Sequence, residues 1–280
     1  MGFEFVSLEK IDKQKIINTL RAYFNDIFFN ALNDCDFNSF VTKFEINLKI
    51  SFLFLDDDKA IGIFLSSIRG DKGYIANISI VDGLKNKGYG RVVLQKGINL
   101  FHQNGCKFIL LDVLQENNIA LNLYRSEGFE IQNEIYHYSS EKKTFYTTNI
   151  QSYSMEKTNP FNFHQIYINF DRENNIWQKS LNGLLINLNN KQYELFLLRN
   201  NRKIEGYVII NRDEYSLKIH ALSLKDLNEQ SLSVLLSLLP VDGKKVQIRN
   251  VYKNEKIVRF IEKIGFSIEN KQYQMIKELL

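Results

Sequence analysis

Apolar positions along the first half of the chain follow two different spacings. Over residues 8–33 they recur about every 3.6 residues, which predicts one or two helices. Elsewhere, short runs of alternating or continuously apolar residues bounded by polar turns predict strands. The predicted strands are 3–6, 51–55, 60–67, 74–81, 107–114, 129–138 and 143–148, and further helices are predicted over 40–48, 90–104 and 117–127. This order predicts an α/β domain with a seven-stranded sheet.

Turn residues separate these elements. Residues 33–38 and 69–73 are predicted turns, and Gly105 and Gly128 stand where a glycine would close a helix. The hairpin tip Asp56-Asp57-Asp58-Lys59 could indicate a cation site, but an exposed tip explains three aspartates better. The four histidines have no metal-ligand spacing, so we expect no metal site.

One turn combines glycine with positive charge. After the strand at 74–81, Asp82-Gly83 ends the strand, and Gly88-Tyr89-Gly90 opens the helix at 90–104. Lys85, Lys87 and Arg91 add charge to this turn. The first N–H groups of a helix have no partner within the helix, and the helix dipole is positive there. The turn therefore suits a phosphate, although a Gly-x-Gly alone also occurs for packing reasons.

The second half repeats the first in a weaker form. Residues 202–209 echo 59–64, with Gly206 offset from Gly62 by 144, and residues 254–266 echo 117–129 at an offset of 137. The second copy is therefore about seven residues shorter in the interval that holds the glycine turn of the first copy. Between Leu224 and Val246 the only glycine is Gly243, and Ile261 stands at the offset of Tyr124. We expect the second copy to keep the fold and to lack the phosphate site.

A polar stretch over residues 149–162 predicts the boundary between domains at 1–150 and 160–280. The formal charge is −1 over 1–150 and +5 over 151–280, with no basic stripe, which argues against nucleic-acid binding. No apolar run has membrane-spanning length, and residues 1–5 lack a secretory pattern. The two cysteines, Cys35 and Cys106, fit a reducing compartment, so a cytoplasmic location is expected.

Two motifs in the first half together resemble those of the GNAT N-acetyltransferase superfamily. The first is the basic-x-x-Gly-x-Gly turn that starts at Lys85. The second, about thirty residues later, runs Asn117-x-x-Ala-x-x-Leu-Tyr124 and then Gly128-Phe129. The resemblance implies a GNAT fold of mixed sheet and helices, with a catalytic first domain and a degenerate GNAT-like second domain. It implies acetyl-CoA as co-substrate and a primary amine as acceptor: a small molecule, a peptide N-terminus or a lysine.

The resemblance also implies roles for single residues. The pantetheine arm of acetyl-CoA would pair with 78–81, the N–H of Ile80 would polarise the thioester carbonyl, and Tyr124 would protonate the leaving thiolate. The implied cofactor-binding residues are Ile78, Ser79, Ile80, Val81, Lys85, Asn86, Lys87, Gly88, Tyr89, Gly90, Arg91, Asn117 and Tyr124. For Asn117, helix capping is the simpler role. The chain departs from the family in having Lys85 in place of Arg or Gln, and Asn86 in place of Gly. The second change fits if φ at residue 86 is negative.

No general base stands out, because Ile75 occupies the strand position where many relatives carry a glutamate. Asp71, Asn77, Asp112 and Glu127 are near in sequence. For Asp112, an orientation toward the opposite face or an ion pair with Lys or Arg is the favoured interpretation. A non-catalytic module that binds CoA or a protein is therefore the alternative function. The acceptor's identity and the choice between monomer and homodimer stay open at this level.

Overall fold

The computed structural model describes residues 2–23, 37–141, 145, 147, 150–170 and 176–279. The chain forms two compact units, which are described separately: Met1–Gln132 with Tyr273–Leu280, and Asn133–Gln272. The domains predicted from the sequence, 1–150 and 160–280, assign the last eight residues to the second half. In the structure these residues belong to the first unit.

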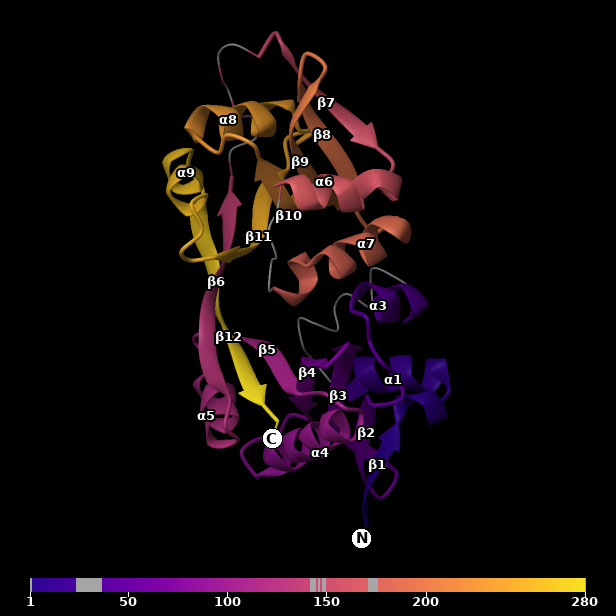
Figure 1. Ribbon diagram of the computed structural model, residues 1–280. Helices are drawn as coiled ribbons and strands as arrows, with labels where there is room; N and C mark the ends of the chain where they lie inside the picture. Colours follow the sequence, from indigo (N-terminus) through magenta and orange to yellow (C-terminus); the bar gives the residue numbers. More distant parts are fainter. Residues whose placement is uncertain are drawn as a thin grey trace. The chain divides into compact units, whose positions relative to one another are not determined.

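The first unit is built on a mixed sheet (Figure 1). Its strands are β1 (Phe3–Ser7), β2 (Phe52–Asp56), β3 (Lys59–Arg69), β4 (Lys72–Ile80), β5 (Phe108–Leu114) and the end of β12 (Ser267–Glu278), in the order β1-β2-β3-β4-β5-β12. Strands β1 to β4 pair antiparallel, whereas β4 and β5 pair parallel. A mixed sheet combined with helices confirms the predicted fold class.

Helices cover both faces of this sheet. The 3-10 helix η1 (Leu8–Lys10), α1 (Lys13–Tyr23) and α3 (Phe37–Lys43) contribute buried residues to a core that includes Ile63 and Leu65 of β3. The opposite face packs against α4 (Tyr89–Gln103) and α5 (Asn118–Ser126) through Phe64, Val93, Phe101 and Leu121. Alternate residues of one strand thus enter different cores, as the period of two requires.

Most predicted elements of this unit occur within a few residues of their expected limits. The helix predicted over 40–48 is an exception, because α3 begins at Phe37 and ends at Lys43. Glu45 then has a left-handed φ of 53°, which a continuing helix does not allow. The predicted turn at 33–38 is wrong at Phe37 and Asn38, which are helical. Residues 24–36, where the first predicted helical region continues, lie outside the described residues.

The neighbour of β5 is the C-terminal strand. The sequence predicts a strand at 143–148 for the end of the sheet, but these residues lie largely outside the described part of the chain. In the structure β12 lies beside β5, and the N–H of Leu279 donates to the carbonyl of Lys107 at 2.7 Å. Met275 is fully buried in the same core as Tyr124 and Phe129. The end of the chain is therefore part of the first unit's core.

The second unit has a similar layout. Its strands are β6 (Glu130–Ser140), β11 (Lys245–Tyr252), β10 (Ser216–Leu224), β9 (Lys203–Arg212), β8 (Glu194–Asn200) and β7 (Tyr153–Thr158), in that order across the sheet. Its helical segments are η2 (Pro160–Asn162), α6 (Phe163–Phe170), η3 (Trp177–Lys179), α7 (Leu181–Asn189), α8 (Glu229–Leu238) and α9 (Val258–Lys263). Helices α6 and α7 share one core with β8 and β9, and α8 and α9 share another.

The stretch predicted as a polar linker contains β7. Tyr153 and Met155 pack against the second unit's core, while Ser154 and Glu156 alternate with them, so β7 pairs with β8 despite its polar composition. A strand with only one apolar face is easily read as a linker when the window is short.

Strand register confirms the internal repeat. Lys72 to Ile75 pair with Phe108 to Leu111 in the first unit, and Ser216 to Ile219 pair with Lys245 to Ile248 in the second. Residues 72–75 and 216–219 are offset by 144, and residues 108–111 and 245–248 are offset by 137, as the sequence predicts. Both copies also have an irregularity at the equivalent point, where the register skips Ala76 in β4 and His220 in β10. The two units therefore share one strand plan down to a bulge.

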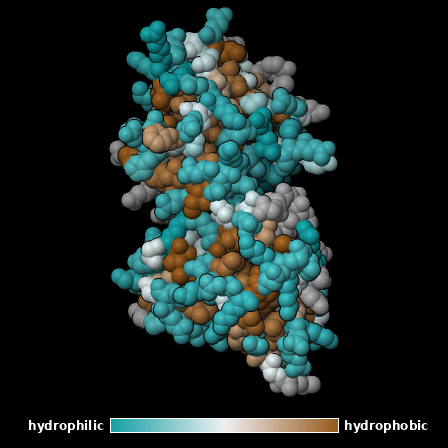
Figure 2. Space-filling model, turned by 90° about the vertical axis from the view of Figure 1, so that its right-hand side faces the viewer, coloured by the Kyte–Doolittle hydropathy of each residue, from teal (hydrophilic) through white to brown (hydrophobic). Residues whose placement is uncertain are grey.

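The surface shown in Figure 2 is mostly polar, with apolar side chains in patches between charged ones. Among the described residues, the most exposed large apolar side chains include Phe161, Tyr215 and Ile119. No helix in the described ranges has the length and apolar character needed to cross a membrane.

Candidate functional site

The N-terminus of α4 is the centre of the candidate site. Its N-cap residue, Gly88, supplies no side-chain hydrogen bond, and no acidic residue stands in the first turn. The first helical bonds run from the N–H groups of Arg91 and Val92 to the carbonyl of Gly88. The N–H groups that precede them are oriented out of the helix end, where an anion gains both hydrogen bonds and the favourable dipole.

Left-handed backbone shapes the loop before α4. Gly83, Asn86 and Gly88 have φ values of 83°, 62° and 87°. The condition stated from the sequence, a negative φ at residue 86, is therefore not met. Asparagine is the non-glycine residue that tolerates this region best, so Asn86 can take the place of the family's glycine without a large penalty.

The charged side chains of the loop differ in their partners. Lys85 forms an exposed ion pair with Asp82 at 2.7 Å, and Lys87 is exposed. Arg91 donates to Ser126 Oγ at 2.9 Å and pairs with Glu127 at 3.2 Å, which connects α4 to the end of α5. In this structure Arg91 therefore stabilises the contact between two helices, and only the lysines extend from the loop.

Tyr89 and Val81 contribute main chain rather than side chain to this region. The ring of Tyr89 lies 5.7 Å from that of Phe3 and 6.0 Å from that of Phe54. Val81 donates its N–H to the carbonyl of Ile61 at 3.0 Å and packs its side chain on the α1 and α3 core. The loop is thus anchored at both ends by ordinary packing.

Strand β4 directs two N–H groups away from β3. In an antiparallel pair, alternate residues bond to the neighbouring strand and the others point to the opposite edge. Because Val81 bonds to Ile61, the N–H groups of Ile78 and Ile80 point toward β5. The paired register of β4 and β5 ends at Ile75 and Leu111 within the described residues. Both N–H groups therefore face the region where these two strands separate.

Side chains of this part of β4 lie on different faces. Ile78 and Ile80 pack against the α4 and α5 core, and a Cβ on Gly62 would lie only 2.9 Å from Cδ1 of Ile80. Ser79 donates to Asn77 Oδ1 at 2.9 Å on the other face. Ile80 thus combines a packed side chain with an N–H directed into the separation.

Tyr124 lies on α5 and is 9% exposed, with its ring 5.7 Å from that of Phe129. Its position in the core with Leu111 and Val113 places it on the α4 side of β5. Asn117 caps α5 by accepting a hydrogen bond from the N–H of Ala120 at 3.1 Å, so the predicted capping role is confirmed. A role of Asn117 or Tyr124 toward a cofactor stays a prediction.

The carboxylates near the site have distinct partners. Glu127 pairs with Arg91 and Gln95, and Asp71 is exposed at the turn before β4. Asp112 is half-buried and accepts a hydrogen bond at Oδ2 from the hydroxyl of Tyr74 at 2.9 Å. Leu111 and Val113 point into the α4 and α5 core, so Asp112 points to the opposite face, the first of the two orientations favoured from the sequence. The partner Tyr74 was not predicted, because parallel register brings β4 and β5 together only in the fold.

The second unit presents the opposite arrangement at the equivalent helix. The connection from β10 to α8 is short, residues 225–228, whereas residues 81–88 connect β4 to α4. Asn228 and Ser231 form a capping box, with Oδ1 of Asn228 accepting from the N–H of Ser231 at 2.9 Å. The N–H of Asn228 in turn donates to Oγ of Ser231 at 3.1 Å. Glu229 adds negative charge to the first turn. This helix end is satisfied by its own side chains and repels an anion.

No cluster of metal-ligating side chains is found among the residues that the structure describes.

Known proteins resemble this chain in sequence and in fold. Residues 17–129 match the family "Acetyltransferase (GNAT) family". A curated relative, N-alpha-acetyltransferase 30 of Schizosaccharomyces pombe, is 28% identical over 95 residues, which span 32% of this chain and 63% of the relative's length.

Solved structures resemble the whole chain. A tandem GNAT protein from the clavulanic acid biosynthesis pathway has a TM-score of 0.68 at 10% identity, covering 99% of this chain and 98% of its own. A putative acetyltransferase from Pyrococcus horikoshii has a TM-score of 0.67 at 13% identity, covering 100% and 89%. A GCN5-related N-acetyltransferase from Anabaena variabilis has a TM-score of 0.65 at 16% identity, covering 99% and 73%. At these identities the structures show a shared fold. The family match is confined to residues 17–129, and the solved structures show that the whole chain has the fold of tandem GNAT proteins.

Proposed function

We propose that the first unit transfers an acetyl group from acetyl-CoA to a primary amine, and that the second unit does not bind the cofactor. The observation that carries the proposal is the contrast between two equivalent helix ends. The α4 N-terminus lacks a side-chain cap and first-turn acid, and the α8 N-terminus has both. A pyrophosphate would gain hydrogen bonds at α4, whereas at α8 it would displace an existing cap beside Glu229.

The first unit supplies groups for each step of direct transfer in a ternary complex. The loop N–H groups with Lys85 and Lys87 hold the pyrophosphate, and β4 aligns the pantetheine arm along residues 78–81. The N–H groups of Ile80 and Ile78 point to where the thioester oxygen gains negative charge, and one such donor is worth roughly 3 kcal/mol in a site without water. As the amine nitrogen attacks the carbonyl carbon, the C–S bond breaks and the Tyr124 hydroxyl donates its proton to sulfur. The proton that the nitrogen then loses restores the Tyr124 hydroxyl.

The experiment is calorimetric titration of acetyl-CoA into the wild type and into Gly88→Val. Residue 88 has a φ of 87°, so valine strains the loop and crowds the phosphate, and affinity should fall tenfold or more. Gly105→Val is the matched control, because Gly105 closes the other end of α4 with a φ of 77° and the same open surroundings. If both folded variants bind as the wild type does, the loop does not hold the pyrophosphate.

The same titration measures stoichiometry in the intact chain. We expect one acetyl-CoA per chain. Two equivalents per chain would contradict the assignment. It would also be contradicted if replacement of Asn228 or Ser231 lowered the affinity for acetyl-CoA while Gly88→Val left it unchanged, because cofactor binding would then lie in the second unit.

A non-catalytic CoA-binding module is the second candidate. The observation in its favour is Ile75, which is buried in the α4 and α5 core at the strand position where many relatives have a glutamate. Release of thiol from acetyl-CoA in the presence of amines separates the two functions, since a module would bind acetyl-CoA without releasing thiol.

A further inference from the structure

A carboxylate and a phenol meet where β4 and β5 separate. Asp112 directly follows Leu111, the last residue of β5 with a registered partner in β4. Tyr74 lies one residue before Ile75, which is the last residue of β4 with a registered partner in β5. The hydroxyl of Tyr74 donates to Oδ2 of Asp112 at 2.9 Å. Tyr74 is 6% exposed and Asp112 is half-buried, so the carboxylate is held in a defined position at this point.

The pair lies on the face of the sheet opposite Tyr124. Leu111 and Val113 point into the α4 and α5 core, and Asp112 between them therefore points to the other face. Ser79 and Asn77 lie on that face too, further along β4. The N–H groups of Ile78 and Ile80 point into the separation between the strands. A thioester carbonyl held in this separation would have Tyr124, the proposed proton donor to the leaving thiolate, on one side of the sheet and Asp112 on the other.

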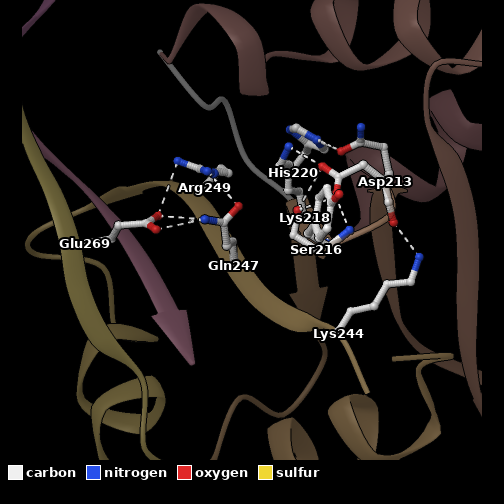
Figure 3. A network of polar contacts seen from close by, with 10 residues as sticks. Asp213, Ser216, Lys218, His220, Lys244, Gln247, Arg249 and Glu269 are labelled. Carbon is white, nitrogen blue, oxygen red and sulfur yellow. Dashed lines mark hydrogen bonds and ion pairs between the residues drawn. The ribbon is translucent and has the colours of Figure 1, made fainter. Parts of the chain in front are cut away.

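The second unit shows that the fold does not need this pair. At the repeat offsets, Lys218 stands in place of Tyr74 and Arg249 in place of Asp112. The parallel register and the bulge are nevertheless kept. Figure 3 shows that the two replacements belong to separate interactions. Lys218 donates to Asp213 at 2.7 Å, and Arg249 donates to Gln247 at 2.7 Å. The unit without an open phosphate loop has thus also lost the carboxylate and the phenol.

We infer that Asp112 receives the first proton of the acceptor amine and that Tyr74 positions its carboxylate, an assignment that rests on the proposed acetyl transfer. The acceptor arrives as a cationic ammonium and is attracted by the negative charge of Asp112. The ammonium gives one proton to Asp112, and the nitrogen then forms a bond to the carbonyl carbon. The C–S bond breaks, the sulfur keeps its electron pair and takes the proton of Tyr124. The second nitrogen proton restores the Tyr124 hydroxyl, and Asp112 releases its proton to solvent.

Two acceptor probes of similar size separate this role from a structural one. Ethylamine is cationic near neutral pH and must lose an ammonium proton before attack, whereas hydroxylamine is largely uncharged. Initial rates of thiol release from acetyl-CoA are measured with each probe. Asp112→Asn should lower kcat/KM for ethylamine by about 100-fold. For hydroxylamine the loss should be less than about threefold, because only the proton acceptor is removed.

Tyr74→Phe keeps the ring and removes the hydrogen bond. Loss of a donor to the carboxylate favours its protonated form, so the acid limb of the ethylamine pH profile should move to higher pH. Asp58→Asn, which removes an exposed carboxylate at the β2–β3 hairpin of the same unit, should leave both rates unchanged. Acetyl-CoA affinity by calorimetry is the check that each variant is folded and loaded.

The outcomes are distinct. Equal losses with both probes, or no loss with either, in an Asp112→Asn variant that binds acetyl-CoA would overturn the assignment and leave the proposed transfer standing. A wild type that binds acetyl-CoA but releases no thiol with either probe would overturn the proposed transfer, and this assignment with it.

Discussion

His137 gives the second unit an acid-sensitive stability that can be worked out from the structure. The side chain is 9% exposed on β6, with Nε2 3.2 Å from Oε1 of Gln272 and Nδ1 3.4 Å from Arg249. Burial, followed by the positive charge of Arg249, lowers the pKa of His137 to about 4, although Gln272 and Glu269 oppose the shift. The folded unit therefore holds a neutral imidazole at pH values where the unfolded chain binds a proton.

The sign follows from proton binding. Below the unfolded pKa of about 6.5 the unfolded state takes up a proton that the folded state refuses, so stability falls as the pH is lowered. The loss continues until the folded pKa of about 4 and then levels off. Integration of the linkage relation gives about 2.5 kcal/mol lost between pH 7.5 and pH 4.5. Burial opposes the shift, but hydrogen bonds from a lysine and further nearby donors or positive charges lower the pKa values of Asp213, Glu194 and Glu269, which act mainly below this window.

The assay is urea unfolding followed by tryptophan fluorescence. The chain has one tryptophan, Trp177, which is 6% exposed and lies in the second unit, so the signal reports that unit. The difference in unfolding free energy between wild type and His137→Gln should shift by about 2.5 kcal/mol in favour of the variant from pH 7.5 to 4.5. His164→Gln, which removes an exposed histidine of the same unit, should follow the wild-type curve. A wild-type-to-variant difference that stays constant across this range would refute the argument.

Two further predictions concern the first unit. Tyr124→Phe should lower kcat by roughly 100-fold with acetyl-CoA affinity nearly unchanged; equal turnover across several pH values, with chemistry rate-limiting, would return Tyr124 to a packing role. Met275→Ala removes a fully buried side chain from the Tyr124 core and should destabilise the first unit by about 2–5 kcal/mol in calorimetric unfolding. Exposed Glu278 on the same strand supplies the control Glu278→Ala, and an unchanged Met275→Ala transition would contradict the assignment of the strand to this core.

The fold could be predicted from the sequence because its signals are local. The spacing around Gly88, the capping residue Asn117 and the offsets of 144 and 137 all depend on residues near one another in the chain or on simple repetition. The partners of Arg91 and Asp112 were missed for a different reason. Each partner depends on which strands or helices are adjacent in the fold. Neither the contact of α4 with α5 nor the parallel register of β4 and β5 produces a periodic pattern in the sequence.

The strand at the C-terminus was missed for the same kind of reason. Residues 267–278 have an ordinary strand pattern, and their sequence position indicates the second half. Only the pairing order shows that residues 273–280 complete the first unit. The positive φ of Asn86 could not be predicted, because asparagine is compatible with either sign and local sequence does not choose between them.

The shared C-terminal strand also sets the order in which the protein can mature during synthesis. Residue 132 leaves the ribosome long before residue 273, and at about 5–20 residues per second the delay between them is about 7–28 s. During that time the first unit lacks the strand that carries Met275, so its core is open beside β5. The unit that begins to be translated first thus stays incomplete until residues 273–280 are made, and loss of these residues would damage the unit of residues 1–132 rather than the unit that directly precedes them.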